Sequence, residues 1–356
     1  MTGRAVLGAA LATCAAIAAP AAQGATKTVG AGPSSADLRA LKLRSIPRDV
    51  EWNLFMRKTV TIRVGDRVRW TMNGSHTVTF LNRRRRPGRL SADRRAPVAG
   101  VNDAAGNPFW FDGRPAVLYN TAVTSKKGGS AFSPNRVVSS GLTLSSGRRK
   151  AYVLRFRRPG RFPYACLLHP SMSGTVVVKR RGARVPRKSQ DRKAARAELR
   201  KVVQAAIVRE GAVVVPARAA QAGGTAFIQA GNDGAGFAVM KFFPAEASVL
   251  AGVPVTLRVA PGSDANHTFA FGPPDVVKNL SDNLLVRRSS RRVELLPQAV
   301  WASDATLPPH GPTVHGNGFL NTGILDTGAL GDSPLPLSSN ATVTFGTPGT
   351  YALYCL

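Results

Sequence analysis

The sequence predicts an all-β protein made of two similar β-sandwich domains in tandem, joined by a basic helical spacer. Many short stretches alternate apolar and polar residues, which is typical of half-buried strands. Turn-forming residues separate these stretches, with 35 Gly and 25 Pro in the chain, and one pattern of motifs occurs twice. The length of 356 residues also suits two domains, since a domain usually contains about 100–200 residues.

The first residues have the features of an export signal. Arg4 supplies a positive charge, and Val6–Ala22 is a run of apolar and small residues. This run is too short for a membrane-spanning helix, which needs about 20 apolar residues. We therefore expect residues 1–24 to be a signal peptide and the protein to be exported, either secreted or associated with the cell envelope. The sequence before Cys14 resembles a lipobox, so a lipoprotein anchored at Cys14 is the alternative.

The repeated pattern divides the chain. In the first copy Gly65–Trp70 precedes His76, and Pro159-Gly160 precedes Cys166; in the second, the corresponding residues are Gly252–Leu257, His267, Pro348-Gly349 and Cys355. The separation from His to Cys is 90 residues in the first copy and 88 in the second. This agreement predicts a tandem duplication, with domain 1 at residues 25–180 and domain 2 at residues 223–356.

Individual elements follow from local patterns. Val60–Val64 alternates apolar and polar residues, and Gly174–Val178 is predicted to be a strand that closes the core. Between the two copies, residues 181–222 are expected to form a basic linker with a helix over Ser189–Glu210. Apolar residues recur there every 3–4 positions, Ser189 is a suitable N-cap, and Gly211 a suitable end. A membrane-surface or partner-binding helix is the alternative to a simple spacer.

The strongest chemical motif is Cys166-Leu167-Leu168-His169-Pro170-Ser171-Met172, which spaces Cys, His and Met three residues apart between two predicted strands. His76, at the start of another strand, supplies a second imidazole. Two His, one Cys and a weakly bound Met are the ligand set of a blue (type 1) copper site. We therefore predict one copper per chain, held in domain 1 by His76, Cys166, His169 and Met172. A Cys166–Cys355 disulfide is the structural alternative, because exported proteins meet an oxidising compartment.

These motifs resemble the cupredoxin family, the plastocyanin- and azurin-like blue copper proteins. The segments on which the resemblance rests are Gly65-Asp66-x-Val68-x-Trp70, Ser75-His76-Thr77-Val78 and Phe162-x-Tyr164-x-Cys166-x-x-His169-Pro170-x-Met172-x-Gly174. The His-Pro-x-Met loop looks most like that of amicyanin, and the resemblance covers both copies. It implies Greek-key β-sandwiches, a one-electron carrier that cycles between Cu(II) and Cu(I), and a His169 ring edge that faces solvent through an apolar patch.

Two features depart from the family. The stretch between His76 and Cys166 is much longer than in single-domain carriers and contains Arg83–Arg86 and Pro108–Gly113. We expect inserted loops and extra strands packed on the sandwich, with a docking surface or a lid over the copper as the alternative. The second copy keeps His267 and Cys355 but lacks a His and a Met three and six residues after the Cys. We therefore expect at most a partial second site, and a natural chain that continues further.

The ligand context favours an electron carrier over an enzyme. Multicopper oxidases and nitrite reductases also stack such domains, but they need a His directly beside the blue-copper Cys. Here Ala165 and Leu167 flank Cys166, and no His-x-His occurs. A copper-binding or storage module without a redox circuit stays open, because the same ligands could serve it.

The net charge of +30 indicates anionic partners. Such a chain attracts polyanions with strong salt dependence, but export argues against nucleic acid as the natural partner. An acidic redox partner or an anionic envelope surface fits better.

Overall fold

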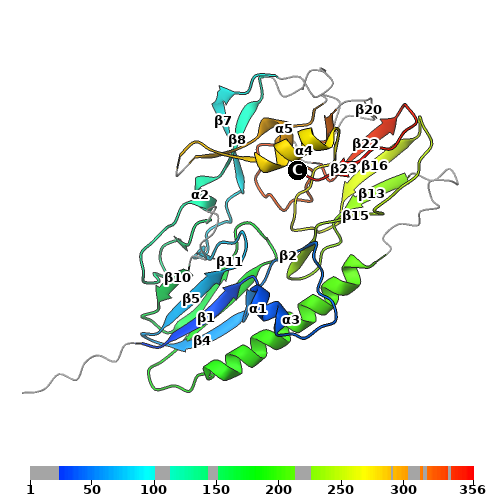
Figure 1. Ribbon diagram of the computed structural model, residues 1–356. Coiled ribbons are helices and arrows are strands. Elements are labelled where there is room, and N and C mark those ends of the chain that lie inside the picture. The colour runs from blue at the N-terminus through cyan, green and yellow to red at the C-terminus, as the bar shows by residue number, and fades with distance from the viewer. Residues whose placement is uncertain are drawn as a thin grey trace, which may run out of the picture.

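The computed structural model describes residues 24–100, 113–142, 151–212, 226–289, 292–303, 313–315, 319–335 and 338–356. These residues form mainly short strands and one long helix, which confirms the all-β class (Figure 1). Within these ranges no helix combines the length and the apolar character needed to cross a membrane. The predicted signal peptide with Cys14, and most of Pro108–Gly113, lie outside the described residues.

Two sheets enclose the core of residues 24–180, here called the N-terminal region. One sheet has the strand order β10 (Ala151–Arg155), β5 (Arg67–Met72), β1 (Thr26–Ala31) and β3 (Phe55–Met56). The other has the order β4 (Thr59–Arg63), β12 (Ser173–Lys179), β11 (Gly160–Ala165), β6 (Thr79–Phe80) and β9 (Val138–Ser139). Both contribute to one buried core that includes Trp70, Phe80 and Phe156. The predicted closing strand is β12, paired with β11 and β4.

The C-terminal region, residues 226–356, contains two further sheets around a second core. The larger has the order β15 (Phe242–Phe243), β13 (Ala226–Ala230), β16 (Pro254–Val259), β22 (Asn340–Phe345) and β20 (Thr313–His315). The smaller has the order β21 (Leu320–Asn321), β17 (Ala270–Phe271) and β23 (Leu353–Tyr354). Their shared core includes Leu257, Phe269 and Val343.

The two regions pair their strands alike. In the N-terminal region β1 is parallel to β5 and antiparallel to β3, and β5 is antiparallel to β10. In the C-terminal region β13 is parallel to β16 and antiparallel to β15, and β16 is antiparallel to β22. Thus the segments that share motifs in the sequence also share strand neighbours.

Two sheets join the regions. One pairs β2 (Val50–Trp52) with β14 (Phe237–Val239), and the other has the order β18 (Leu285–Arg287), β19 (Val293–Leu295), β8 (Pro115–Tyr119) and β7 (Leu90–Pro97). The long stretch between His76 and Cys166 therefore does carry extra strands, as expected. They pair with a strand of the C-terminal region, however, because β8 meets β19. Short helices complete the fold: α1 (Ser35–Arg39), α2 (Thr121–Thr124), α4 (Pro274–Asp282) and α5 (Pro297–Val300).

The long helix α3 (Lys188–Glu210) runs along both regions (Figure 1). It ends at Gly211 as predicted, but the predicted N-cap Ser189 is wrong. The cap is Arg187, whose backbone N–H donates to the Gln190 side chain at 2.7 Å, so Ser189 lies inside the first turn.

Helix α3 is more than a spacer. Leu199 and Val203 share a buried cluster with Leu41 and Met56 of the N-terminal region. Ala206 shares the next cluster, together with Phe237 and Val239 of the C-terminal region. The apolar face of the helix therefore packs on both regions, while most of its basic residues are exposed.

Candidate metal centre

Three of the predicted ligands meet at one end of the N-terminal sandwich. His76 lies between β5 and β6, Cys166 directly follows β11, and His169 lies in the short loop that leads to β12. Two backbone hydrogen bonds shape this loop: Cys166 N donates to Met172 O at 2.9 Å, and Met172 N donates to His169 O at 3.0 Å. Because β11 and β12 pair up to Ala165 and Ser173, the loop is held between two fixed strand ends.

The donor atoms of these residues converge. His76 Nδ1 lies 3.2 Å from His169 Nδ1, and Cys166 Sγ lies 3.5 Å from His169 Nδ1. All three atoms lie within 4.8 Å of one another, and all three residues are buried. Two imidazole nitrogens and one thiol sulfur thus face a common point.

This arrangement fits one metal ion. An ion about 2.0 Å from each nitrogen and about 2.3 Å from the sulfur, as in tetrahedral zinc sites, would hold the two nitrogens roughly 3.3 Å apart and a nitrogen and the sulfur roughly 3.5 Å apart. The observed separations of 3.2 and 3.5 Å match both values. A donor set of two His and one Cys suits copper, and with a weak axial thioether it is typical of blue copper.

The predicted fourth ligand, Met172, is only 1% exposed and packs in the same core cluster as Cys166. Its backbone bonds with Cys166 and His169 place it at the base of the loop. Met172 as an axial ligand stays a prediction that rests on the motif.

The surroundings of Cys166 favour its thiolate form. Burial alone would raise the pKa of this thiol, but hydrogen bonds and charge interactions with His169 and His76 outweigh burial and lower the pKa well below its usual range. The Thr77 backbone N–H adds a further donor at 3.3 Å from Sγ. A deprotonated sulfur is the form that binds metals.

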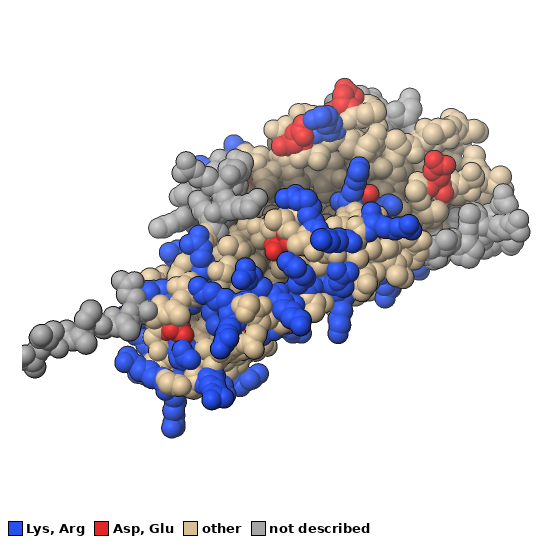
Figure 2. Space-filling view, turned by 60° about the horizontal axis from the view of Figure 1, so that its bottom comes forward, with Lys and Arg blue, Asp and Glu red and all other residues tan. Residues whose placement is uncertain are grey.

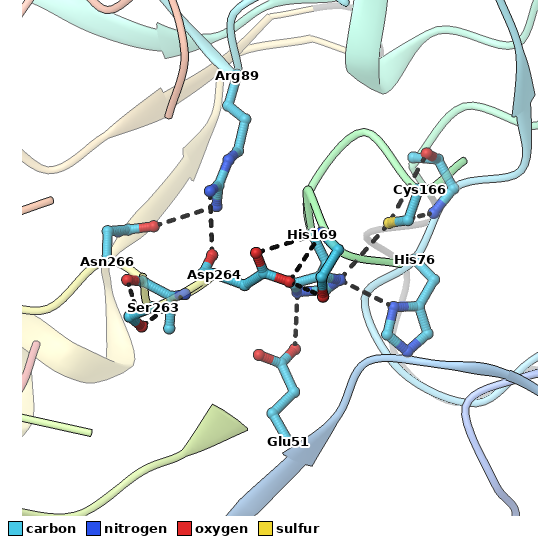
Figure 3. Close-up of polar contacts among 11 residues, drawn as sticks. Glu51, His76, Arg89, Cys166, His169, Ser263, Asp264 and Asn266 are labelled. Atoms are coloured by element: carbon cyan, nitrogen blue, oxygen red, sulfur yellow. Dashed lines mark hydrogen bonds and ion pairs between the residues drawn. The ribbon is translucent and has the colours of Figure 1, made fainter. Parts of the chain in front are cut away.

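The ring edge of His169 does not face solvent, so this expectation from the family resemblance is wrong. The side chain is 7% exposed, and its Nε2 lies 3.4 Å from Oε1 of Glu51 (Figure 3). Burial lowers the pKa of His169, but contacts with Cys166 and Glu51 prevail and raise it to about 9. The edge is covered because β2, which carries Glu51, pairs with a strand of the C-terminal region.

Residues outside the predicted ligand set hold the loop from two sides. Arg86, from the inserted stretch, donates to the carbonyls of Cys166 at 2.8 Å and Pro170 at 3.4 Å. From the C-terminal region, Asp264 accepts from the Ser171 backbone N–H at 3.0 Å. The insertion therefore contacts the ligand loop through Arg86, while a docking surface or a lid over the copper stays a prediction.

The predicted partial second site contains the same pair of side chains. His267 Nδ1 lies 3.6 Å from Cys355 Sγ, and the Thr268 backbone N–H donates to this sulfur at 3.5 Å. No third His, Cys, Asp or Glu among the described residues joins them to form a metal-ligating cluster. Cys166 and Cys355 are both free thiols, so the alternative of a disulfide between them is wrong.

Glu51, Arg86 and Asp264 are the functional residues that sequence reasoning missed. Arg86 lies in the basic run Arg83–Arg86 of the inserted stretch, for which the sequence predicts no specific contact. Glu51 and Asp264 are single acidic residues in segments without a motif, so only the pairing of the two regions brings them to the ligand loop.

The fold and the cluster define an all-β protein with a buried group of two His and one Cys. No family model matches the sequence, and no curated protein matches it. Matching solved structures include an oxidised methionine-to-lysine variant of amicyanin (16% identity, covering 36% of this chain and 76% of that chain, TM-score 0.20). They also include the copper(I) form of a methionine-to-alanine variant of amicyanin (16% identity, 45% and 87%, TM-score 0.21) and an oxidised proline-to-alanine variant (18% identity, 45% and 87%, TM-score 0.21). These TM-scores are low, so the likenesses carry no conclusion about function.

Proposed function

We propose that this chain is an exported blue (type 1) copper protein and a one-electron carrier, not an enzyme. The observation that carries the proposal is the convergence of His76 Nδ1, His169 Nδ1 and the Cys166 sulfur on one buried point. A copper bound there would supply the Cu(II)/Cu(I) couple. The chain's own part is to hold a thiolate and two imidazoles on two strands and a short loop, which limits rearrangement when the charge of the ion changes.

The proposal includes two tandem cupredoxin-like Greek-key domains, with one complete copper site in the first. The matching strand pairs of the two regions support this organisation. The ring edge of His169, where the family resemblance places the exit of electrons, is covered by Glu51. This covered edge favours a second candidate function, a copper-binding or storage module without a redox circuit.

The surface charge supports an anionic partner. Figure 2 shows Lys and Arg side chains over much of the face that comes forward when the lower side of Figure 1 is turned to the viewer, with few Asp and Glu. The exposed basic residues of α3 are Lys188, Arg192, Lys193, Arg196, Lys201 and Arg209. An acidic redox partner or an anionic envelope surface would be attracted to such a field, and salt would weaken the attraction.

Titration of the purified chain with Cu(II), followed by visible absorption and electron paramagnetic resonance, tests the metal. We expect an intense thiolate-to-copper band at one copper per chain. Cys166→Ser should abolish the band because it removes the sulfur donor, whereas Cys355→Ser is the matched control and should leave it intact.

Three outcomes would change the assignment. A band that survives Cys166→Ser would contradict the assigned site. Colourless binding with a preference for Zn²⁺, which the same donors suit, would replace copper by zinc. A stable blue centre that neither an electrode nor small inorganic reductants can reduce rapidly would favour storage over electron transfer.

A further inference from the structure

The imidazole of His169 has two nitrogens in different surroundings. Nδ1 faces Cys166 and His76, at 3.5 and 3.2 Å from their donor atoms. Nε2 points away from this cluster and lies 3.4 Å from Oε1 of Glu51 (Figure 3). A metal on Nδ1 therefore leaves Nε2 to carry the ring proton and to donate it toward the carboxylate.

Backbone pairing between the two regions fixes the position of Glu51. Glu51 faces Ala238 in the antiparallel pair of β2 and β14. On one side of it, Met240 N donates to Asp49 O at 2.7 Å, and on the other, Asn53 N donates to Gly236 O at 2.8 Å. The carboxylate thus projects from a strand tied down at both ends and does not hang from a free loop.

The contact is also partly shielded from water. His169 is 7% and Glu51 35% exposed at their side chains. In partly buried surroundings a full negative charge acts more strongly on a nearby ion than it would in bulk water. A carboxylate that accepts the remote N–H of a ligating histidine orients the ring and makes it a stronger donor.

We propose that Glu51 is a positioning residue of the metal centre, which fixes the ring of His169 through Nε2 and stabilises Cu(II) relative to Cu(I). This inference rests on the proposed function. A stronger donor and a negative charge both favour the more positively charged ion, so the carboxylate lowers the reduction potential. The C-terminal region takes part through the strand that holds Glu51 in place.

The test compares Glu51→Gln with Glu294→Gln in the full copper-loaded chain. Glu51→Gln keeps the volume of the side chain and removes its charge. Glu294 is a matched control, because it is also partly buried and paired with cations, Arg288 and Arg292, both at 2.8 Å. The readouts are the reduction potential, the affinities for Cu(I) and Cu(II) measured separately, and the pulsed electron paramagnetic resonance signal of the remote imidazole nitrogens.

We expect Glu51→Gln to weaken Cu(II) binding about tenfold, with a much smaller change for Cu(I). Tenfold is the lower end of the loss in metal affinity when the hydrogen-bond partner of a ligating histidine is mutated. A tenfold fall in the ratio of Cu(II) affinity to Cu(I) affinity corresponds to a rise in potential of about 59 mV for a one-electron couple. The coupling of one remote nitrogen should change at the same time. Glu51→Asp keeps the charge but retracts it by one methylene group, so it should shift the potential in the same direction and by less.

The outcomes separate this inference from the proposed function. If the unmodified chain shows no thiolate-to-copper band, the proposed function itself fails. If the chain is blue but Glu51→Gln matches Glu294→Gln in potential and in remote-nitrogen coupling, only the role of Glu51 is overturned. Should Glu51→Gln not fold, Glu51→Asp decides alone: an unchanged potential and nitrogen signal would overturn the inference.

Discussion

The two regions build a histidine–cysteine pair in the same way. A threonine backbone N–H donates to each sulfur, from Thr77 to Cys166 at 3.3 Å and from Thr268 to Cys355 at 3.5 Å. The hydroxyl of each threonine then accepts from the backbone N–H after the cysteine, at 2.7 Å in the first region and 2.6 Å in the second. The scaffold around the sulfur is therefore repeated.

The protonation of the two pairs differs. The pKa of Cys166 lies well below its usual range, because its interactions with two imidazoles outweigh burial. In the second pair, desolvation raises the pKa of Cys355 even though part of the residue is exposed, and burial lowers that of His267 to about 4. The scaffold alone thus yields a neutral pair, whereas in the first region interactions with two imidazoles lower the pKa of the cysteine.

The largest expected effect comes from making the first site resemble the second. His169→Ala removes the third donor, so we expect the thiolate-to-copper band to disappear and copper affinity to fall by more than about 100-fold. Mutation of a residue that only hydrogen-bonds to a ligand lowers metal affinity by up to about 100-fold, so loss of a ligand itself should lower it further. Absorption and metal competition measure both effects. His267→Ala is the control and should change neither; a blue band that survives His169→Ala would show that this imidazole is not a ligand.

The next effect concerns the contact between the regions. Arg89 is 6% exposed and donates to Ala329 O at 2.9 Å and to Asp264 O at 3.1 Å. Arg89→Ala leaves these partly buried acceptors unpaired, so the free energy of unfolding should fall by about 1–3 kcal/mol in denaturant titrations.

A surface arginine from the same stretch provides the control for this change. Arg85 pairs with Asp332 at 3.0 Å, but the two side chains are 84% and 67% exposed. Arg85→Ala should cost no more than about 1 kcal/mol. Equal losses for the two variants would show that Arg89 does not join the regions.

The smallest effect is expected for the fourth predicted ligand. Met172→Leu conserves side-chain volume, so stability should change by less than about 1.5 kcal/mol and the blue band should remain. Loss of a weak donor destabilises Cu(II) more than Cu(I), so the reduction potential should rise. We expect a rise of the order of 59 mV, which corresponds to a tenfold change in the ratio of Cu(II) affinity to Cu(I) affinity. A potential equal to that of the unmodified chain would show that the Met172 sulfur does not act on the ion.

The ligand cluster could be predicted because its information is local. Cys166 and His169 are three residues apart between two alternating strands, and His76 lies just before a third strand, β6. A glycine packs closely against each of the two upstream histidines. Gly32 and Gly231 both have positive φ angles. A Cβ atom would lie 3.1 Å from His76 Nε2 at Gly32 and 3.3 Å from His267 Nε2 at Gly231. At both positions a side chain larger than glycine would crowd the ring of the histidine.

What covers the cluster could not be predicted. β2 is three residues long and β14 also three, too short for a periodic pattern to show that they pair. The resemblance to single-domain carriers implies an exposed edge for His169, because it takes no account of a second region that lies over the ligand loop. Glu51 and Asp264 act on this loop only because segments nearly 100 residues or more from it in the sequence are folded against it.

The pairing of β2 with β14 and of β8 with β19, together with the packing of α3 on both cores, has a consequence for the integrity of the chain. Each half contributes structure to the other, so the peptide link after α3 is one connection among several. A chain cut at that link would persist as a noncovalent heterodimer of two complementary fragments. The N-terminal fragment alone would not keep the His169 edge closed, since the strand that carries Glu51 would lose its neighbour β14.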